Sequence, residues 1–181
     1  TKFNTLKKIY HISDIQIRNL KRHIEYEQVF NNLYDYIKKD TKDAVVFIGG
    51  DIAHSKTDMS PELVDQLSRL FKNLSELCPT LLIAGNHDCN LNNKSRLDVL
   101  TPIVDNIKNE NLHYLKDTGV YYIADTAFSV LDVWDDEASK IPDPADINSK
   151  NKILLYHGTI DRSETDLGFQ LQSKIKLTDF D

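Results

Sequence analysis

The chain has 181 residues, of which 40% are hydrophobic and 28% charged, a balance that excludes a disordered or low-complexity protein. No apolar run approaches the roughly 18 residues that span a bilayer, and residues 1–10 carry no signal-peptide stretch. We therefore expect a non-secreted, cytoplasmic or nuclear protein without membrane association. The net charge of −6 disfavours a broadly basic nucleic-acid-binding surface, and two cysteines do not make a disulfide framework.

Short apolar runs alternate with helical patterns in the first half of the chain, and consecutive strands dominate the second half. The expected strands are 6–12, 44–48, 80–84, 112–116, 120–123, 127–133 and 152–156. The expected helices are 23–39, 60–77 and 95–108. The order β-α-β-α-β predicts parallel strands joined by right-handed crossovers, so we expect one α/β domain.

Side chains that suit metal ions directly follow four of the predicted strands. In chain order they are Asp14, Gln16, Asp51, His54, Asn86, His87, Asp88 and His157. One Asp or His after a strand is usually a turn or capping residue. Because the carboxyl ends of parallel strands meet at one edge of a sheet, however, four such ends in succession predict a shared site.

The residue types at these strand ends indicate a site for two divalent ions. Two metal ions roughly 3.5–4 Å apart neutralise phosphoryl oxygens and generate hydroxide near neutral pH, as phosphate-ester hydrolysis requires. Asp, Asn and His suit Mn, Fe or Zn, whereas an all-oxygen shell would favour Mg. Gly49, Gly50 and Gly85 allow the backbone to approach the ions closely. The sequence thus predicts a dinuclear phosphoesterase, with Mn, Fe or Zn as the candidate metals.

Gly-Gly-Asp at 49–51, Gly-Asn-His-Asp at 85–88 and the strand-end His157 together resemble the calcineurin-like metallophosphoesterase family. The resemblance implies a two-sheet β sandwich flanked by helices, with the metals at the strand ends. The metal ligands that it implies are Asp51 as the bridge, Asp14 and Gln16 on the first metal, and Asn86 and His157 on the second. The catalytic pair that it implies is His87, acting on the transition state or the leaving oxygen, and Asp88, holding the His87 imidazole.

The segments HISDIQIRNLKRHIEYEQVF (11–30) and FIGGDIAHS (47–55) resemble, more narrowly, the SbcD-type DNA repair nucleases and their viral relatives. This resemblance implies a Mn-dependent 3′-to-5′ exonuclease, with endonuclease activity as an option, that processes DNA ends in double-strand-break repair. The implied partners are an SMC-like coiled-coil ATPase of the SbcC type and a second copy of the chain. His54 would help to handle the DNA end. The implied DNA contacts are Arg18, Lys21, Arg22 and His23, a stretch that is equally well explained as a solvated loop.

Two departures from the family pattern lower the expected metal affinity. Gln16 stands where the family usually has a histidine, and a neutral amide oxygen is a poorer ligand for Mn or Zn than imidazole. The family pattern also continues with a further strand and two more histidine ligands, whereas no histidine follows His157 here. We therefore expect residues 1–181 to be a domain incomplete at its C-terminal end, with weak metal binding and little activity.

Two alternatives to a nuclease stay open at this stage. The acidic net charge favours a phosphatase or cyclic-nucleotide phosphodiesterase acting on small phosphoesters. Gln16 favours a non-catalytic scaffold with a degenerate site, although His87 and Asp88 would have no evident purpose there. Residues 161–174 predict either a loop that covers the site or an amphipathic helix.

Overall fold

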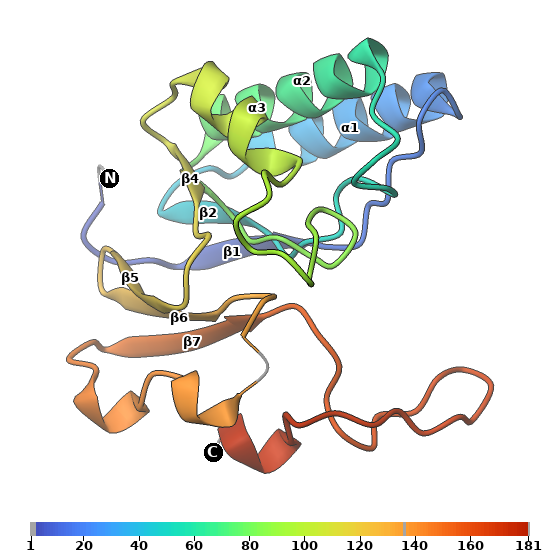
Figure 1. The fold of residues 1–181 in the computed structure, drawn as a ribbon. Coiled ribbons are helices and arrows are strands. Elements are labelled where there is room, and N and C mark those ends of the chain that lie inside the picture. The colour runs from blue at the N-terminus through green and yellow to red at the C-terminus, as the bar shows by residue number, and fades with distance from the viewer. Residues whose placement is uncertain (1–2, 136, 181) are drawn as a thin grey trace.

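Two stacked β-sheets form the centre of the molecule, with three helices over one of them (Figure 1). The computed structural model describes residues 3–135 and 137–180. The first sheet is parallel and has the order β1 (Lys8–Ile12), β2 (Ala44–Ile48), β3 (Thr80–Leu82) and β4 (Leu112–Tyr114). The second has the order β5 (Gly119–Ile123), β6 (Thr126–Leu131) and β7 (Asn151–Tyr156), with β5 antiparallel and β7 parallel to β6. The predicted α/β fold with two sheets is confirmed.

Helices α1 (His23–Lys38), α2 (Pro61–Leu77) and α3 (Leu100–Ile107) all cover the outer face of the first sheet (Figure 1). Helix α2 begins as the sequence predicts, because the Ser60 hydroxyl accepts a hydrogen bond from the Leu63 N–H and proline takes the first helical position. Its buried face consists of Leu63, Leu67, Leu70, Phe71 and Leu74.

Helix α3 starts five residues later than the predicted residue 95. The Asn93 side chain accepts the N–H of Ser95, and the Asp98 carboxylate accepts the N–H groups of Leu100 and Thr101. These side-chain contacts hold the segment before Leu100 in turns, since Asn and Asp compete with the helix for backbone donors. The predicted bounds of the seven strands, by contrast, agree with the structure within two residues.

Strand β2 is buried along its whole length because the sheet is covered on both faces. Ala44, Val46 and Ile48 pack in the core beneath the helices, whereas Val45 and Phe47 pack in the core between the two sheets. The carboxyl end of β2 therefore lies between both layers, at the edge where β1 and β7 also end (Figure 1).

The segment that follows β7 is an extended loop that projects from the sheets (Figure 1). A single bridge joins Glu164 to Gln170, and the tip exposes Leu167 and Phe169. The alternative of an amphipathic helix at 161–174 is therefore wrong, because this segment packs no apolar face. In the described part of the chain, no helix is long and apolar enough to cross a membrane.

Candidate metal centre

The loops after β1 and β2 pair with each other beyond the ends of the strands. The Asp14 N–H donates to the Gly50 carbonyl (3.1 Å), and the Gln16 N–H donates to the Asp51 carbonyl (3.0 Å). Asp14, Gln16 and Asp51 all adopt left-handed backbone conformations, with φ of 53°, 48° and 50°. A non-glycine residue in this region costs on the order of 1 kcal/mol, so three such residues in one place indicate a constraint that serves a site.

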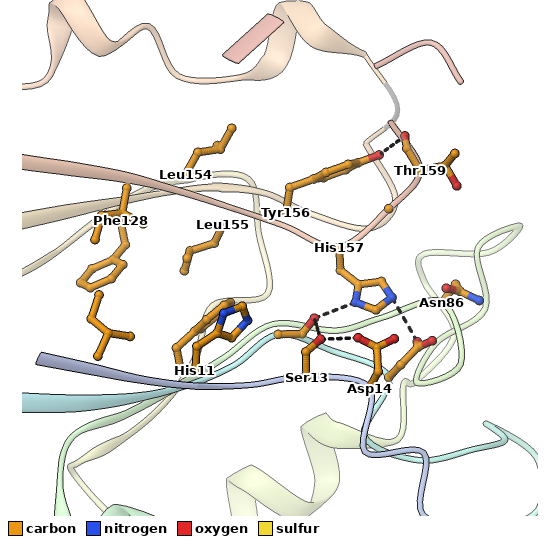
Figure 2. A pocket seen from close by; sticks show the side chains of 16 residues that line it. His11, Ser13, Asp14, Asn86, Phe128, Leu154, Leu155, Tyr156, His157 and Thr159 are labelled. Atoms are coloured by element: carbon orange, nitrogen blue, oxygen red, sulfur yellow. Dashed lines mark hydrogen bonds and ion pairs between the residues drawn. The ribbon is translucent and has the colours of Figure 1, made fainter. Parts of the chain in front are cut away.

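Asp14, Asp51 and His157 form a compact cluster at the carboxyl ends of β1, β2 and β7. One ligand atom from each residue lies within 4.8 Å of the other two. His157 Nδ1 donates to the Gly49 carbonyl (2.6 Å), and its Nε2 lies 3.4 Å from Asp51 Oδ1 (Figure 2). A backbone acceptor on Nδ1 is the usual device that leaves Nε2 free for a metal ion. The cluster therefore has the geometry of a cation site.

Two glycines make room for the cluster. A Cβ atom on Gly85 would lie 2.1 Å from Asp51 Oδ1, and one on Gly50 would lie 2.7 Å from His157 Nδ1. Gly50 also has a φ of 93°, which side chains rarely adopt. The cradle and the donor set of two carboxylates and an imidazole fit a divalent ion such as Mn, Fe or Zn.

Burial and hydrogen bonding set the charges within the cluster. Burial disfavours the ionised form of Asp51, but hydrogen bonds from His157 and from the His87 N–H (2.9 Å) hold the pKa of Asp51 below its usual range. The hydrogen bond to Asp51 raises the pKa of His157 to about 9. Without metal, the two residues thus form an ion pair at neutral pH.

Metal binding is expected to tighten as the pH rises, because the metal must displace the proton of His157. Because the pKa of His157 is raised in the folded state, its proton stabilises the metal-free fold. This contribution is fully present below pH about 6.5 and is lost as the pH rises through about 9. The logarithm of the Mn²⁺ association constant should therefore rise by about one per pH unit between these values and then level off. Calorimetry at several pH values measures this slope. His157→Gln should abolish it, and a flat wild-type profile would contradict the assignment.

The cluster lies at one end of a cleft of about 720 Å³ between the two sheets (Figure 2). Asn86 lines the same end, so four of the five predicted metal ligands come together there. The other end is apolar, and its lining includes Ile9, Phe47, Phe128, Ile153 and Leu155. Gln16, the fifth predicted ligand, does not line the cleft. The metal-binding roles of these residues stay predictions.

His54 and His87 lie side by side next to the cluster. Their rings stack with centroids 5.7 Å apart, and His87 Nδ1 donates to the His54 carbonyl (2.7 Å). His87 Nε2 lies 3.9 Å from Asp51 Oδ2. The amide oxygen of Gln16 lies 3.3 Å from His54 Nδ1. His87 is thus within reach of a group bound at Asp51, and His54 lies behind it, in contact with the His87 ring.

The prediction that Asp88 holds the His87 ring is wrong. The Asp88 carboxylate is fully buried and accepts hydrogen bonds from the backbone N–H groups of Ile52, Ala53 and Gly85 at 2.9–3.0 Å. Burial raises the pKa of Asp88 to about 6, against the effect of these three donors. Asp88 instead joins the loop after β2 to the loop after β3. The family resemblance implied the wrong partner for Asp88, because His87 Nδ1 donates to the His54 carbonyl instead.

Three of the four predicted DNA-contacting residues lie in an exposed loop before α1, and the fourth, His23, is the half-buried first residue of α1. Arg18, Lys21 and Arg22 are exposed, and the His23 ring bonds to the Arg18 carbonyl (2.8 Å). Arg22 pairs with Glu25 at 3.4 Å, an exposed contact worth little in water.

Lys56 is a cation at the site that the sequence analysis missed. Its Nζ donates to the Asn86 carbonyl (3.3 Å). A hydrogen bond between Asn19 and Asp58 (2.7 Å) ties its loop to the basic loop before α1. The sequence signal that could have identified Lys56 is its position two residues after His54. We call Lys56 and the cations of the joined loop, Arg18, Lys21 and Arg22, the basic rim.

The fold and the cluster are typical of one class of protein, the hydrolases that hold metal ions at the ends of parallel strands. Residues 7–179 match the family model described as calcineurin-like phosphoesterase, and the chain belongs to this family.

Two comparisons identify similar proteins. The chain is 43% identical over 183 residues to "Uncharacterized protein R555" of Acanthamoeba polyphaga mimivirus, an alignment that covers 93% of this chain and 13% of that protein. The chain therefore spans a small part of that relative's length. Among solved structures, nuclease MPE of Pseudomonas putida is similar with a TM-score of 0.42 and 15% identity, covering 68% of this chain and 54% of that chain.

Proposed function

We propose that the chain is a Mn-dependent nuclease that hydrolyses phosphodiester bonds at DNA ends. The observation that carries the proposal is the position of Lys56 beside Asn86, which lines the same end of the cleft as the Asp14–Asp51–His157 cluster. A cluster that holds divalent ions suits any phosphate ester, whereas a cationic rim beyond it suits a substrate with several phosphates. The resemblance to SbcD-type nucleases supports DNA as that substrate and 3′-to-5′ exonuclease activity as the reaction.

Asp14, Asp51, Asn86 and His157 would hold two divalent ions, with Asp51 shared between them. Such ions neutralise the phosphoryl oxygens and lower the pKa of bound water. Asp51 remains ionised because hydrogen bonds hold its pKa low. His87, held through Nδ1 by the His54 carbonyl, presents Nε2 for proton transfer to the leaving oxygen. The chain would thus supply the ligands for the ions and, once His87 is protonated at Nε2, a proton donor next to them.

The proposal is tested by digestion of a duplex labelled at one 3′ end, with the chain in excess over DNA so that slow turnover is visible. We expect Mn²⁺-dependent shortening from the 3′ end and none in EDTA. His87→Ala should remove the activity, and Asp105→Ala, on the exposed face of α3, should retain it. Cleavage that persists in His87→Ala, or a duplex that stays intact with Mn²⁺ present, would contradict the proposal.

Lys56→Met is expected to weaken binding to duplex DNA and to reduce its salt dependence. The side chain loses one phosphate contact, which contributes roughly 0.9 to the slope of log affinity against log salt. Fluorescence anisotropy at several salt concentrations in EDTA measures both quantities. Lys42→Met, at the opposite end of β2, is the matched control and should leave the slope unchanged. Equal slopes in Lys56→Met and the wild type would remove Lys56 from the DNA path.

The acidic net charge of −6 favours a second candidate, a phosphoesterase for small substrates. The two candidates differ in what the basic rim does. A small phosphomonoester or cyclic nucleotide reaches the cluster without touching the rim, so Lys56→Met would leave its turnover unchanged. Comparison of kcat/KM for duplex ends with that for a phosphomonoester therefore separates the two.

The resemblance also leads us to propose two partners, an SMC-like coiled-coil ATPase of the SbcC type and a second copy of the chain. Analytical ultracentrifugation of the chain alone tests the homodimer. Co-purification with such an ATPase from the same source tests the other partner. If a correctly folded chain does not co-purify with the ATPase, this partner is contradicted.

A further inference from the structure

Gln16 lies between the metal cluster and the histidine pair. Its backbone N–H donates to the Asp51 carbonyl, and its own carbonyl accepts from the Tyr26 hydroxyl (3.3 Å), so its main chain is held from two sides. Its side chain is half-buried and does not line the cleft. The amide oxygen Oε1 lies 3.3 Å from His54 Nδ1. Its nearest chemical partner is therefore an imidazole.

We infer that Gln16 is a positioning residue that selects the Nδ1–H tautomer of His54, rather than a metal ligand. An amide oxygen only accepts hydrogen bonds, so the proton of this contact belongs to His54 Nδ1. The hydrogen bond made by one ring nitrogen decides which nitrogen carries the proton. His54 Nε2 is thereby left as a hydrogen-bond acceptor. The catalytic role of this tautomer rests on the proposed function, whereas the hydrogen bond and the tautomer themselves do not.

The neighbouring histidine is held in the same way. His87 Nδ1 donates to a carbonyl oxygen, that of His54, and its Nε2 is the nitrogen near Asp51. The two rings are inclined by only 26°. Gln16 and the His54 carbonyl thus give two adjacent imidazoles the same tautomer. In this tautomer the Nε2 atom of each ring is a proton acceptor, so either ring can take a proton from an attacking water and return it from the imidazolium to the leaving oxygen.

The tautomer of each histidine is read directly from long-range ¹H–¹⁵N correlations of the imidazole rings in the metal-free protein. We expect neutral His54 to be Nδ1–H in the wild type and in Gln16→Glu, whose carboxylate still accepts. In Gln16→Met, which is nearly isosteric but has no acceptor, His54 should shift toward the Nε2–H form that free imidazole prefers. His87 is the internal control and should keep Nδ1–H in all three proteins, because its acceptor is a backbone carbonyl.

Calorimetry with Mn²⁺ alone separates this role from metal ligation. We expect Gln16→Met to bind the same number of Mn²⁺ ions per chain as the wild type, since the inference excludes the Gln16 side chain as a metal ligand. A fall in stoichiometry, an unchanged His54 tautomer in Gln16→Met, or Nε2–H in the wild type would each overturn the inference. The wild-type spectrum decides the matter alone if Gln16→Met does not fold.

Turnover gives the third measurement and distinguishes this inference from the proposed function. On duplex ends, kcat should fall in Gln16→Met with KM unchanged, because a misoriented His54 affects the chemical step and not DNA binding. If the wild type does not cleave DNA at all, the proposed function fails while the tautomer result stands. If cleavage is present and kcat is equal in both proteins, the positioning role is overturned.

Discussion

Replacing Asp51 by asparagine is expected to lower the Mn²⁺ affinity of the chain by more than about 100-fold and to abolish hydrolysis. Loss of a residue that merely supports a ligand already costs about 10–100-fold in metal affinity, and Asp51 is at the centre of the cluster. Asp51 is only 4% exposed, so its carboxylate is directed into the cluster and not into solvent. Asparagine also removes the partner that raises the pKa of His157. Calorimetry with Mn²⁺ measures the loss.

The matched control for Asp51→Asn is Asp58→Asn. It removes one carboxylate from the neighbouring loop and retains an oxygen that accepts from Asn19. Its Mn²⁺ affinity should stay within about twofold of the wild type, because exposed charges outside the cluster are screened by solvent. An equal loss in both variants would mean that overall negative charge, and not the cluster, attracts the ion.

Asp88→Ala is expected to lower the free energy of unfolding by about 3–5 kcal/mol. The substitution leaves three buried backbone N–H groups without an acceptor, and each unsatisfied group costs about 1–3 kcal/mol. These donors belong to Ile52, Ala53 and Gly85, so the loops that carry Asp51 and Asn86 would also lose their mutual support. Urea denaturation at pH 7 in EDTA measures the stability without a contribution from metal binding.

Two further variants distinguish the role of Asp88 from a general effect of charge removal. Asp88→Asn keeps one acceptor oxygen but turns an NH₂ group toward backbone donors, so its loss should be almost as large. Asp105→Ala on the exposed face of α3 should change stability by less than about 0.5 kcal/mol. A stable Asp88→Ala with reduced turnover would restore the expectation that Asp88 acts on His87.

The sequence by itself determined the architecture and the place of the site. The apolar run at 44–48 predicts a strand from local sequence alone. A strand that is covered on both faces has apolar side chains at successive positions, as β2 does. The rule that parallel strands end at one edge placed Asp14, Asp51 and Asn86 together, and these residues line one cleft. His157 follows a strand of the second sheet and reaches the same cleft because the two sheets stack. The glycines at positions 50 and 85 were informative because a Cβ atom there would clash with His157 and Asp51, respectively.

Only the tertiary structure decided which side chain each site residue contacts. Asp88 follows His87 in sequence yet bonds to backbone donors 35 and 36 residues away, and Gln16 meets His54 across 38 residues. Lys56 reaches Asn86 across 30 residues. Such partners depend on left-handed loop conformations and on the direction in which each side chain leaves the backbone. Periodicity and motif spacing carry information about strands and their ends, but hydrogen bonds between loops are set by the packing of segments that are distant in the chain.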